Sequence, residues 1–321
     1  MTGRTDIAAV VIGRNEGVRL ISCLDSLVGK VGRIVYVDSG STDGSLAAAR
    51  VRGAEVVELD MTIPFTAARA RNAGFARLAA DGPPPAYVQF LDGDCALQPG
   101  WIETAAAFLD PRPRVAVACG RRRERFPEAS VYNRLIDAEW DTPVGQARSC
   151  GGDALIRTEA LAAVGGYDPT LIAGEEPELC VRLRAAGWEI WRLDAEMTLH
   201  DAAMTRFGQW WQRTRRGGHA FAQGAAMHGA PPERHYVPQL RRALAWGIAL
   251  PLVTLLGAFF TPWALVLLLA WPAQALRLRL RGMPWARAVF LTLAKLPEAQ
   301  GVFTYLWRRL TRARTRLIEY K

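Results

Sequence analysis

The apolar residues in the first part of the chain fall into short continuous runs that alternate with segments of helical spacing. Runs of this length, with few polar interruptions, are typical of strands buried on both faces of a parallel sheet. They occupy four segments: Ile7–Ile12, Arg33–Val37, Glu55–Leu59 and Tyr87–Leu91. The segments between them predict helices over Val18–Val28, Ser45–Arg52 and Thr66–Ala80.

The alternation continues to about residue 200. The further predicted helices are Gly100–Leu109, a short one that begins at Thr158, and Pro177–Ala186. The further predicted strands are Val115–Gly120, Ala154–Arg157 and Trp188–Leu193. Strands and helices that alternate in this way predict an α/β domain with a doubly wound, mostly parallel sheet.

Polar loops follow the first two strands. The first strand leads into Gly13–Gly17 and the second into Asp38–Gly44. In open α/β sheets, ligands bind at the carboxyl ends of the strands. Asp38 can therefore accept a hydrogen bond from a base or ribose, and backbone N–H groups of Asp38–Gly44 can hold phosphate. The alternative for this loop is a turn that caps the next helix, because Ser, Thr and Asp are also preferred N-caps.

Two arginines lie in the early turns of the helix predicted over Thr66–Ala80. Arg69 or Arg71 can neutralise the oxygens of a diphosphate. No Gly-x-Gly-x-x-Gly sequence follows a predicted strand, which excludes the dinucleotide-binding fingerprint.

Two carboxylates separated by one glycine end the strand Tyr87–Leu91. We expect Gly93 to allow a sharp turn, so that Asp92 and Asp94 converge at the edge of the sheet. Two oxygen ligands at this place suit Mg²⁺ or Mn²⁺, which takes the rest of its shell from water and a diphosphate. The alternative is an acidic turn that binds no metal.

A second acidic pair, Glu175–Glu176, lies just before or at the start of the helix Pro177–Ala186. A carboxylate here can accept the proton of an attacking hydroxyl group, and repulsion between neighbouring carboxylates raises the pKa of one of them. The alternative is that both stabilise the N-terminus of the helix through its dipole.

Taken in order, several of these motifs resemble glycosyltransferase family 2, enzymes of the GT-A fold. The matching segments are Val11–Glu16, Val37–Ser45, Ala70–Gly74, Phe90–Asp94, Cys150–Arg157, Val164–Asp168 and Gly174–Arg182. They cover about the first 200 residues. The resemblance implies direct, inverting transfer of a sugar from a nucleotide-diphosphate donor, with Mn²⁺ or Mg²⁺ as cofactor.

The resemblance also implies roles for individual residues. Donor binding falls to Arg14, Asn15, Glu16, Asp38, Ser39, Arg71 and Asp92, and acceptor binding to Gly152 and Asp153. The implied metal ligands are Asp94, Asp92 and His200. Glu176 is the implied base, with Glu175 as the second candidate. Two positions depart from the family pattern: many relatives have Asp at Ser39, and the usual Glu-Asp pair is here Glu175–Glu176.

The run Arg121–Arg125 contains four arginines. Charge runs are usually solvated, and the alternative is that this one helps to hold an anionic donor or acceptor.

Charge is unevenly distributed along the chain. Residues 1–200 carry 22 basic and 27 acidic side chains, a net charge of −5, whereas residues 201–321 carry 18 and 4, a net charge of +14. The first part therefore has the charge of an ordinary soluble enzyme domain, and the second favours an anionic partner. Five cysteines without a Cys-x-x-Cys pair indicate a reducing compartment and argue against a structural zinc site.

The second part has the pattern of a membrane-associated region. Met204–Gly229 interleaves aromatic residues with arginines, which is typical of a helix lying on a membrane surface. Ala243–Phe260 and Trp263–Leu276 lack charged residues and predict a helical hairpin that is either spanning or re-entrant. Arginines on both sides of the hairpin predict that both of its ends are cytoplasmic. The alternative is a buried helical pair in a soluble domain.

The remaining residues extend this picture. Ala286–Trp307 is moderately apolar and is interpreted as interfacial, and Arg308–Arg316 contains five arginines that favour an anionic leaflet. Nucleic acid is a weak alternative partner for the basic tail, because the tail follows an apolar hairpin.

The sequence thus predicts a catalytic domain over 1–203, an interfacial helix and linker over 204–240, and a membrane hairpin with a basic tail over 241–321. The catalytic domain is expected to face the cytoplasm at the inner membrane and to act on a lipid-linked or other saccharide acceptor. Two rivals stay open: a processive polysaccharide synthase, and a catalytically inactive membrane scaffold of the same fold.

Overall fold

The chain divides into two compact units. The structure is a computed structural model that describes residues 4–311 and 317–318. The first unit comprises Met1–Glu128 and Ile136–Ala203, and the second comprises Ala129–Leu135 and Met204–Lys321. The division after residue 203 coincides with the expected boundary. The second unit also takes in Ala129–Leu135, and the expected division of 204–321 into a linker and a hairpin stays a prediction.

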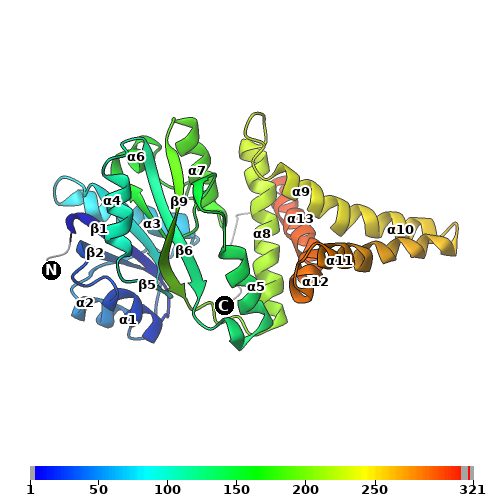
Figure 1. Ribbon diagram of the computed structural model, residues 1–321, viewed down its shortest axis with the longest axis horizontal. Helices are drawn as coiled ribbons and strands as arrows, with labels where there is room; N and C mark the ends of the chain where they lie inside the picture. The colour runs from blue at the N-terminus through cyan, green and yellow to red at the C-terminus, as the bar shows by residue number, and fades with distance from the viewer. Residues whose placement is uncertain (1–3, 312–316, 319–321) are drawn as a thin grey trace. The chain divides into compact units, whose positions relative to one another are not determined.

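A single mixed sheet forms the centre of the first unit (Figure 1). Its strands are β1 (Arg4–Gly13), β2 (Val31–Asp38), β3 (Glu55–Glu58), β4 (Tyr87–Asp92), β5 (Cys95–Leu97), β6 (Val115–Glu124), β7 (Gly145–Ala147), β8 (Ala154–Arg157) and β9 (Glu189–His200). Their order is β3-β2-β1-β4-β8-β6-β9-β5, and β7 pairs with β9. Strands β3, β2, β1 and β4 are parallel, as are β6 and β9. Strand β8 runs antiparallel to both of its neighbours and joins these two parallel groups.

The hydrophobic pattern predicts the strand positions well but not their full lengths. Strand β6 continues through the arginine run to Glu124, and β9 continues to His200, so that Arg122 and Thr198 lie in register. Strands β5 and β7 have three residues each and pair antiparallel with β9. The predicted α/β class is confirmed, and these antiparallel additions make the sheet mixed.

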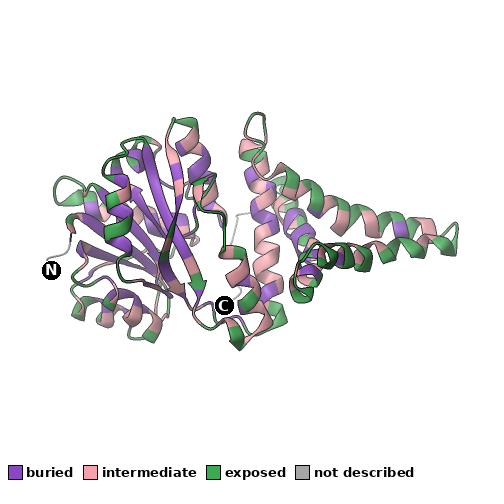
Figure 2. Ribbon diagram, in the orientation of Figure 1, coloured by how far each residue is buried: buried purple, intermediate pink, exposed green. Residues whose placement is uncertain are grey.

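Among the described residues, six helices pack against the sheet: α1 (Val18–Asp25), α2 (Ser45–Val51), α3 (Ala67–Ala80), α4 (Trp101–Leu109), α6 (Thr158–Ala163) and α7 (Glu175–Ala185). Helix α5 (Val131–Trp140) spans the division of the chain, because its residues up to Leu135 belong to the second unit. Figure 2 shows the buried residues concentrated along the strands. Helix α3 lies close to β1 and β2 because Gly74 has no side chain: a Cβ there would collide with Val10 and Val37. This approach positions Arg71, one turn earlier, at the carboxyl edge of the sheet.

In the second unit, α8 (Phe207–His228) packs against α13 (Lys295–Thr311). Gly218 of α8 faces the backbone of Glu298, and Gly301 of α13 faces the backbone of Arg215. Small residues at both places allow the two helix backbones to approach closely. The two segments interpreted as interfacial, Met204–Gly229 and Ala286–Trp307, thus pack against each other, and their interfacial location stays a prediction.

Aromatic residues of α8 take part in the same packing. The ring of Trp210 lies 4.9 Å from that of Phe290, in α12 (Trp285–Leu293), and the ring of Phe221 lies 5.0 Å from that of Tyr236. Both aromatic side chains of α8 therefore contact other residues of the same unit.

The predicted apolar hairpin is present. Its first arm contains α9 (Val237–Leu244), a π-helical segment (Ala245–Ala249) and α10 (Leu250–Ala258), and its second contains a 3₁₀ segment (Pro262–Leu269) and α11 (Ala270–Leu280). Val237–Ala258 has 22 residues and Pro262–Leu280 has 19, and each is long and apolar enough to cross a membrane by length and composition. Of the basic segment Arg308–Arg316, residues 312–316 lie outside the described residues.

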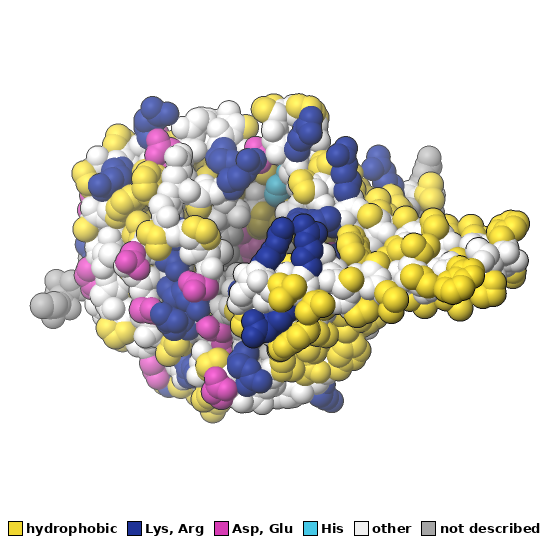
Figure 3. Space-filling model, turned by 45° about the vertical axis from the view of Figure 1, so that its right-hand side comes forward, with side chains coloured by type: hydrophobic (Ala, Val, Ile, Leu, Met, Phe, Trp, Pro, Cys, Tyr) yellow, Lys and Arg dark blue, Asp and Glu magenta, His cyan; other side chains and the backbone are white. Residues whose placement is uncertain are grey.

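The hairpin leaves most of its apolar side chains exposed. Figure 2 shows exposed residues along both arms, and Figure 3 shows that this surface is almost entirely hydrophobic. Phe259, Phe260 and Trp263 at the turn are 83%, 90% and 80% exposed. An apolar surface of this extent requires an apolar environment or a partner. The alternative of a buried helical pair is therefore wrong for the residues that the structure describes.

We expect Gly74→Ala to destabilise the first unit by about 1–3 kcal/mol, because the added methyl group overpacks the contact between α3 and β1. The gain in helix propensity of about 1 kcal/mol offsets only part of this cost. Thermal unfolding of the detergent-solubilised chain measures the effect. Gly217→Ala is the matched control, since a Cβ at this helical glycine meets no atom within 4 Å. Equal unfolding temperatures for both variants would contradict the packing argument.

Candidate functional site

The side chain of Arg71 connects the end of β4 with the start of α7. Its Nη2 donates to Oδ1 of Asp92 at 2.9 Å, and its Nη1 lies 2.9 Å from Oε1 of Glu175 and 3.0 Å from Oε1 of Glu176. The arginine is only 2% exposed. Burial by itself would lower the pKa of Arg71, but the three carboxylates outweigh it and raise that pKa. The guanidinium thus carries a permanent charge and draws these carboxylates together.

A second guanidinium holds the other oxygen of Asp92. Nη2 of Arg122 donates to Oδ2 of Asp92 at 3.0 Å and to Sγ of Cys95 at 3.2 Å. Burial would raise the pKa of Asp92, but Arg71 and Arg122 together hold it below its usual range. Arg122 belongs to the arginine run that the sequence pattern favoured as solvated. That interpretation is wrong for Arg122, because β6 carries it into the site.

Asp153 lies behind Asp92 and is fully buried. Its Oδ1 accepts from the backbone N–H of Asp92 at 3.2 Å, and its Oδ2 accepts from the hydroxyl of Thr198 at 2.7 Å and lies 3.3 Å from Nε of Arg122. Asp153 therefore orients Asp92 and Arg122. The predicted contact of Asp153 with an acceptor has no geometric support, because no part of this side chain reaches the surface.

Gly152, which precedes it, lies directly against the charged groups. A Cβ on Gly152 would stand 2.9 Å from Nη2 of Arg71, 3.0 Å from Oε1 of Glu176 and 3.1 Å from Oδ2 of Asp92. Any side chain here would intrude among them. The glycine is consistent with its predicted place on the acceptor side, where a substrate must approach the same atoms.

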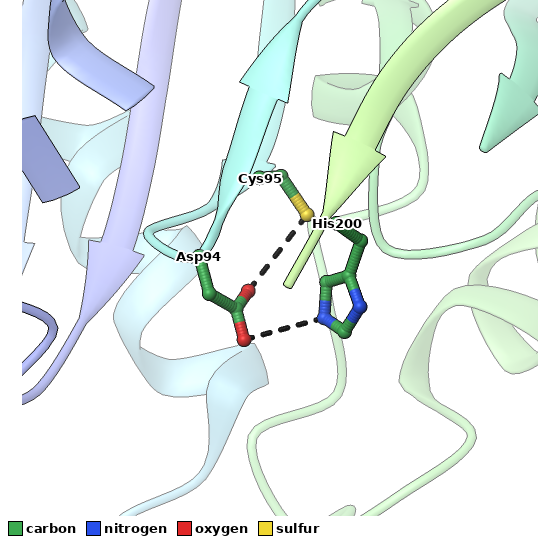
Figure 4. Close-up of side chains that lie close together, drawn as sticks. All are labelled: Asp94, Cys95 and His200. Atoms are coloured by element: carbon green, nitrogen blue, oxygen red, sulfur yellow. Dashed lines mark hydrogen bonds and ion pairs between the residues drawn. The ribbon is translucent and has the colours of Figure 1, made fainter. Parts of the chain in front are cut away.

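Asp94, Cys95 and His200 form a compact group next to these residues (Figure 4). Nε2 of His200 lies 3.2 Å from Oδ2 of Asp94. On the other side of the ring, Nδ1 lies 3.7 Å from Oε2 of Glu124. An imidazole that binds a metal with one nitrogen usually hydrogen-bonds a carboxylate or carbonyl with the other. Here the carboxylate of Glu124 lies on that side of the ring, beyond hydrogen-bond distance. The antiparallel pairing of β5 with β9 brings His200 opposite Cys95.

The possible metal ligands form two groups: Asp94 lies with Cys95 and His200, and Asp92 lies with Cys95 and Asp153. A turn follows β4 at Gly93, as expected. The φ of this glycine lies outside the left-handed region, and its small size is needed because a Cβ would stand 3.2 Å from the carbonyl oxygen of Ile12.

The chemistry of the donor set fits a divalent cation. Acidic side chains outnumber cationic ones in the site: Asp92, Asp94, Asp153, Glu175 and Glu176 against Arg71 and Arg122. Burying an excess of like charge is costly unless a counter-ion compensates it. Carboxylate and imidazole suit Mn²⁺, and carboxylate suits Mg²⁺. Burial and the nearby carboxylates raise the pKa of Cys95 although Arg122 lowers it, which keeps this thiol protonated.

Glu176 is the carboxylate whose proton affinity is changed most clearly. Burial and the neighbouring Glu175 raise its pKa to about 7, although Arg71 acts in the opposite direction. A carboxylate with this pKa can accept a proton near neutrality. Helix α7 begins at Glu175, with Gly174 in a left-handed conformation before it, so both glutamates lie in the first helical turn.

The two loops predicted to bind the donor are connected to each other. The backbone N–H of Asn15 donates to Oγ of Ser41 at 2.8 Å, the N–H of Thr42 donates to Oδ1 of Asn15 at 2.7 Å, and the N–H of Gly17 donates to Asp43 at 3.1 Å. Asn15 adopts a positive φ of 54°. These bonds hold the ends of β1 and β2 in one arrangement, with Arg14 exposed between them.

Asp38 and Ser39 also make hydrogen bonds that stabilise this loop. Oδ2 of Asp38 accepts from the backbone N–H groups of Gly40 and Ser41, and Oδ1 accepts from the hydroxyl of Tyr36. The hydroxyl of Ser39 donates to the carbonyl of Gly13 at 2.9 Å. The backbone N–H groups of Gly40 and Ser41, two of those expected to hold phosphate, thus bond within the loop. The nucleoside contact of Asp38 stays a prediction. Each carboxylate oxygen can accept more than one hydrogen bond, so Asp38 can still accept one from a nucleoside.

Arg69 does not reach the site. Its guanidinium donates to the carbonyl oxygens of Asp60, Ile63 and Pro64 and holds the loop before α3. Of the two arginines considered for a diphosphate, only Arg71 faces the carboxylates. Glu16 pairs with Arg19 at 2.8 Å at the start of α1.

Sequence reasoning missed several members of the site. Trp140 lies with its ring 4.7 Å from the guanidinium carbon of Arg122 and 4.7 Å from the ring of His200. Thr198 orients Asp153, and Glu124 lies near His200. The sequence marked Glu124 only as the acidic residue within the arginine run Arg121–Arg125. Nothing in the sequence marked Trp140 or Thr198.

Comparison with known sequences identifies one family. The pattern of the family described as Glycosyl transferase family 2 matches residues 9–163. A pre-mycofactocin glycosyltransferase of Mycobacterium tuberculosis strain H37Rv is 27% identical over 240 residues, which is 70% of this chain and 48% of that protein. The succinoglycan biosynthesis protein ExoA of Rhizobium meliloti is 29% identical over 236 residues, 69% of each chain. The chain thus spans about half the length of the mycobacterial relative.

Solved structures share the fold. The mannosyltransferase PcManGT from Pyrobaculum calidifontis, in complex with GDP-Man and Mn²⁺, matches with a TM-score of 0.63 at 18% identity and covers 96% of this chain and 89% of its own. Glucosyl-3-phosphoglycerate synthase from Mycobacterium tuberculosis, in complex with Mg²⁺ and UDP, matches with a TM-score of 0.51 at 22% identity and covers 71% and 81%. The fold is therefore GT-A.

We expect Glu176→Gln to stabilise the protein at high pH. The pKa of Glu176 is raised from 4.5 to about 7, so the folded state favours the protonated form. Wild-type protein accordingly loses stability as pH rises from 4.5 through 7, whereas a glutamine does not titrate. The unfolding temperature of the variant should exceed that of wild type at pH 8 by a few degrees, about 2–4 °C per kcal/mol. The difference should shrink towards pH 5.

Glu178→Gln is the control, because Glu178 lies on the same helix and pairs with Arg182 at 2.7 Å. Loss of that ion pair should lower the unfolding temperature. A difference between Glu176→Gln and wild type that does not change with pH would rule out the raised pKa.

Proposed function

Because this chain belongs to glycosyltransferase family 2, we propose that it transfers a sugar from a nucleotide-diphosphate donor to a hydroxyl of a lipid-linked saccharide at the cytoplasmic face of the membrane. The observation that carries this proposal is the adjacency of three groups: the Asp94–His200 pair, the Arg71–Asp92 pair and the carboxylate of Glu176. In this order, the three groups would bind a metal ion with the donor diphosphate, orient the donor sugar and accept a proton.

The donor diphosphate would bind at the end of the site that holds the metal ion. Asp94 and His200 would hold Mn²⁺ or Mg²⁺, which when bound stabilises negative charge on the leaving diphosphate. Asp92, with both oxygens fixed by guanidinium groups, would orient the ribose or sugar. The solved structures of both named glycosyltransferases contain a divalent ion and a nucleotide, ligands of the class proposed here.

Glu176 takes the role of base. With a pKa of about 7 it is substantially ionised at neutral pH and accepts the proton of the acceptor hydroxyl as that oxygen attacks the anomeric carbon. Attack on the side opposite the leaving diphosphate inverts the anomeric centre. Both glutamates pair with Arg71, but the side chain of Glu176 is 13% exposed and that of Glu175 only 5%, which supports Glu176 as the residue that meets the acceptor.

The apolar hairpin supports a membrane location. Between Arg242 and Arg277 it has no charged residue, and its large side chains are exposed. Arginines before and after it favour the cytoplasmic side for both ends, each contributing about 1 kcal/mol against an anionic leaflet. A catalytic domain held at the bilayer has direct access to lipid-linked acceptors. This step rests on location, since no acceptor motif identifies the lipid.

We expect Asp94→Asn to reduce metal-dependent sugar transfer about 100-fold or more, because it removes a charged metal ligand and with it the charge stabilisation of the leaving group. Release of nucleoside diphosphate from a panel of nucleotide-sugars, with Mn²⁺ or Mg²⁺ and a lipid-linked acceptor, measures the effect. Asp81→Asn is a control that carries the same change at an exposed carboxylate, which pairs with Arg77 at 2.6 Å at the end of α3. Wild-type protein that shows no turnover with any donor would favour the inactive scaffold, and products of many added sugars would favour a processive synthase.

We also expect the full chain to float with lipid vesicles that contain phosphatidylglycerol, and to stay bound at high salt, because apolar insertion is not screened. Replacing Leu255 and Leu265 by arginine should release the protein at high salt, since each arginine at the hydrocarbon core costs about 2.5–3.5 kcal/mol. Val18→Arg is the matched control, because Val18 is an exposed apolar residue of the catalytic unit. Equal flotation of the double variant and wild type would exclude insertion of the hairpin.

A further inference from the structure

Two groups of possible metal ligands adjoin in the site and share one residue. The first contains Asp94, Cys95 and His200, and the second contains Asp92, Cys95 and Asp153. Within each group the ligand atoms lie within 4.8 Å of one another. By donor chemistry and spacing alone, the site could therefore hold two cations side by side.

The second group, however, already contacts a cation that belongs to the chain. The guanidinium of Arg122 reaches all three of its members: Oδ2 of Asp92 at 3.0 Å, Sγ of Cys95 at 3.2 Å and Oδ2 of Asp153 at 3.3 Å. These three residues are the ones that could otherwise hold a metal ion. We propose that Arg122 is a built-in cation that occupies the place of a second divalent ion, so that the site binds one ion only, at Asp94 and His200.

Several contacts keep this guanidinium in place. Asp153 is fully buried and its second oxygen is fixed by the hydroxyl of Thr198 at 2.7 Å. On the other side, the ring of Trp140 lies 4.7 Å from the guanidinium carbon, within the range of a cation–π interaction. The side chain of Arg122 is 12% exposed. An arginine does not lose its proton in proteins, so the charge is permanent.

The fixed charge determines what the second group can bind. An additional divalent ion between Asp92 and Asp153 would have to displace the guanidinium or lie against it, and repulsion between the two cations opposes this in a buried site. Both oxygens of Asp92 are then engaged by Arg71 and Arg122. Asp92 thus acts as an oriented hydrogen-bond acceptor rather than a metal ligand, and Arg122 is a positioning residue.

The number of bound ions tests this inference. Titration of the full-length, detergent-solubilised protein with Mn²⁺, followed by calorimetry and by the electron paramagnetic resonance signal of free Mn²⁺, measures it without nucleotide or turnover. Wild type should bind one equivalent. Arg122→Met leaves the carboxylates of Asp92 and Asp153 without their cation and should bind a second equivalent. Arg122→Lys keeps the charge and should return the number to one.

Arg121→Met is the control for loss of a buried arginine. Arg121 precedes Arg122 on β6, is 6% exposed and pairs instead with Asp137 at 3.0 Å. This variant should bind the same number of ions as wild type. Equal numbers for Arg122→Met and wild type, or two ions in wild type, would overturn the inference.

The inference rests on the proposed function only in assigning the first ion to Asp94 and His200, and the two can fail separately. Wild type that binds no Mn²⁺ would refute the proposed metal site, while a gain of one equivalent in Arg122→Met would still support the role of Arg122. If Arg122→Met does not fold, anomalous diffraction from wild-type crystals soaked in Mn²⁺ decides. A single peak at Asp94 and His200 supports the inference, and a peak between Asp92 and Asp153 overturns it.

Discussion

The buried guanidinium of Arg71 binds the carboxylates of both halves of the site. It contacts Asp92 at the end of β4 and the two glutamates at the start of α7, segments about 80 residues apart in the chain. Without this cation, three carboxylates would lie close together away from water, and their repulsion and desolvation would oppose folding of the site. Arg71 is itself placed by packing, because Gly74 allows α3 to approach β1 and β2. The geometry of donor and acceptor groups therefore depends on one close contact between a helix and the sheet.

The same balance of charge explains the chemistry of the site. Two arginines compensate only part of the negative charge, which leaves both an affinity for a divalent cation and one carboxylate, Glu176, with a pKa near neutrality. A fully compensated cluster would bind no metal and contain no base. The desolvation that makes the cluster expensive to form also makes its remaining electrostatic interactions strong. The same buried charges therefore determine both the stability of the folded site and its chemistry.

The second unit solves a different physical problem. Its core consists of α8 and α13, whose glycines permit close helix packing, while its hairpin keeps an apolar surface that the chain itself does not cover. In water such a surface is a liability, but in a bilayer it would need no further cover, since helices satisfy their backbone groups internally. Under the proposed membrane location, the arginines that flank the hairpin would contact lipid headgroups.

The sequence alone determined the order of strands and helices, the place of Asp92, Asp94 and the two glutamates at strand or helix ends, and the apolar hairpin. These features depend on local periodicity and on residues near one another in the chain. It did not determine that Arg122 enters the site, that Asp153 supports Asp92, or that Asp92 and Asp94 belong to separate groups. Those facts depend on pairing between β6, β8 and β9, strands separated by dozens of residues. An arginine run on a strand has the same local pattern whether its partners are water or buried carboxylates, and only the tertiary structure brings those carboxylates to it.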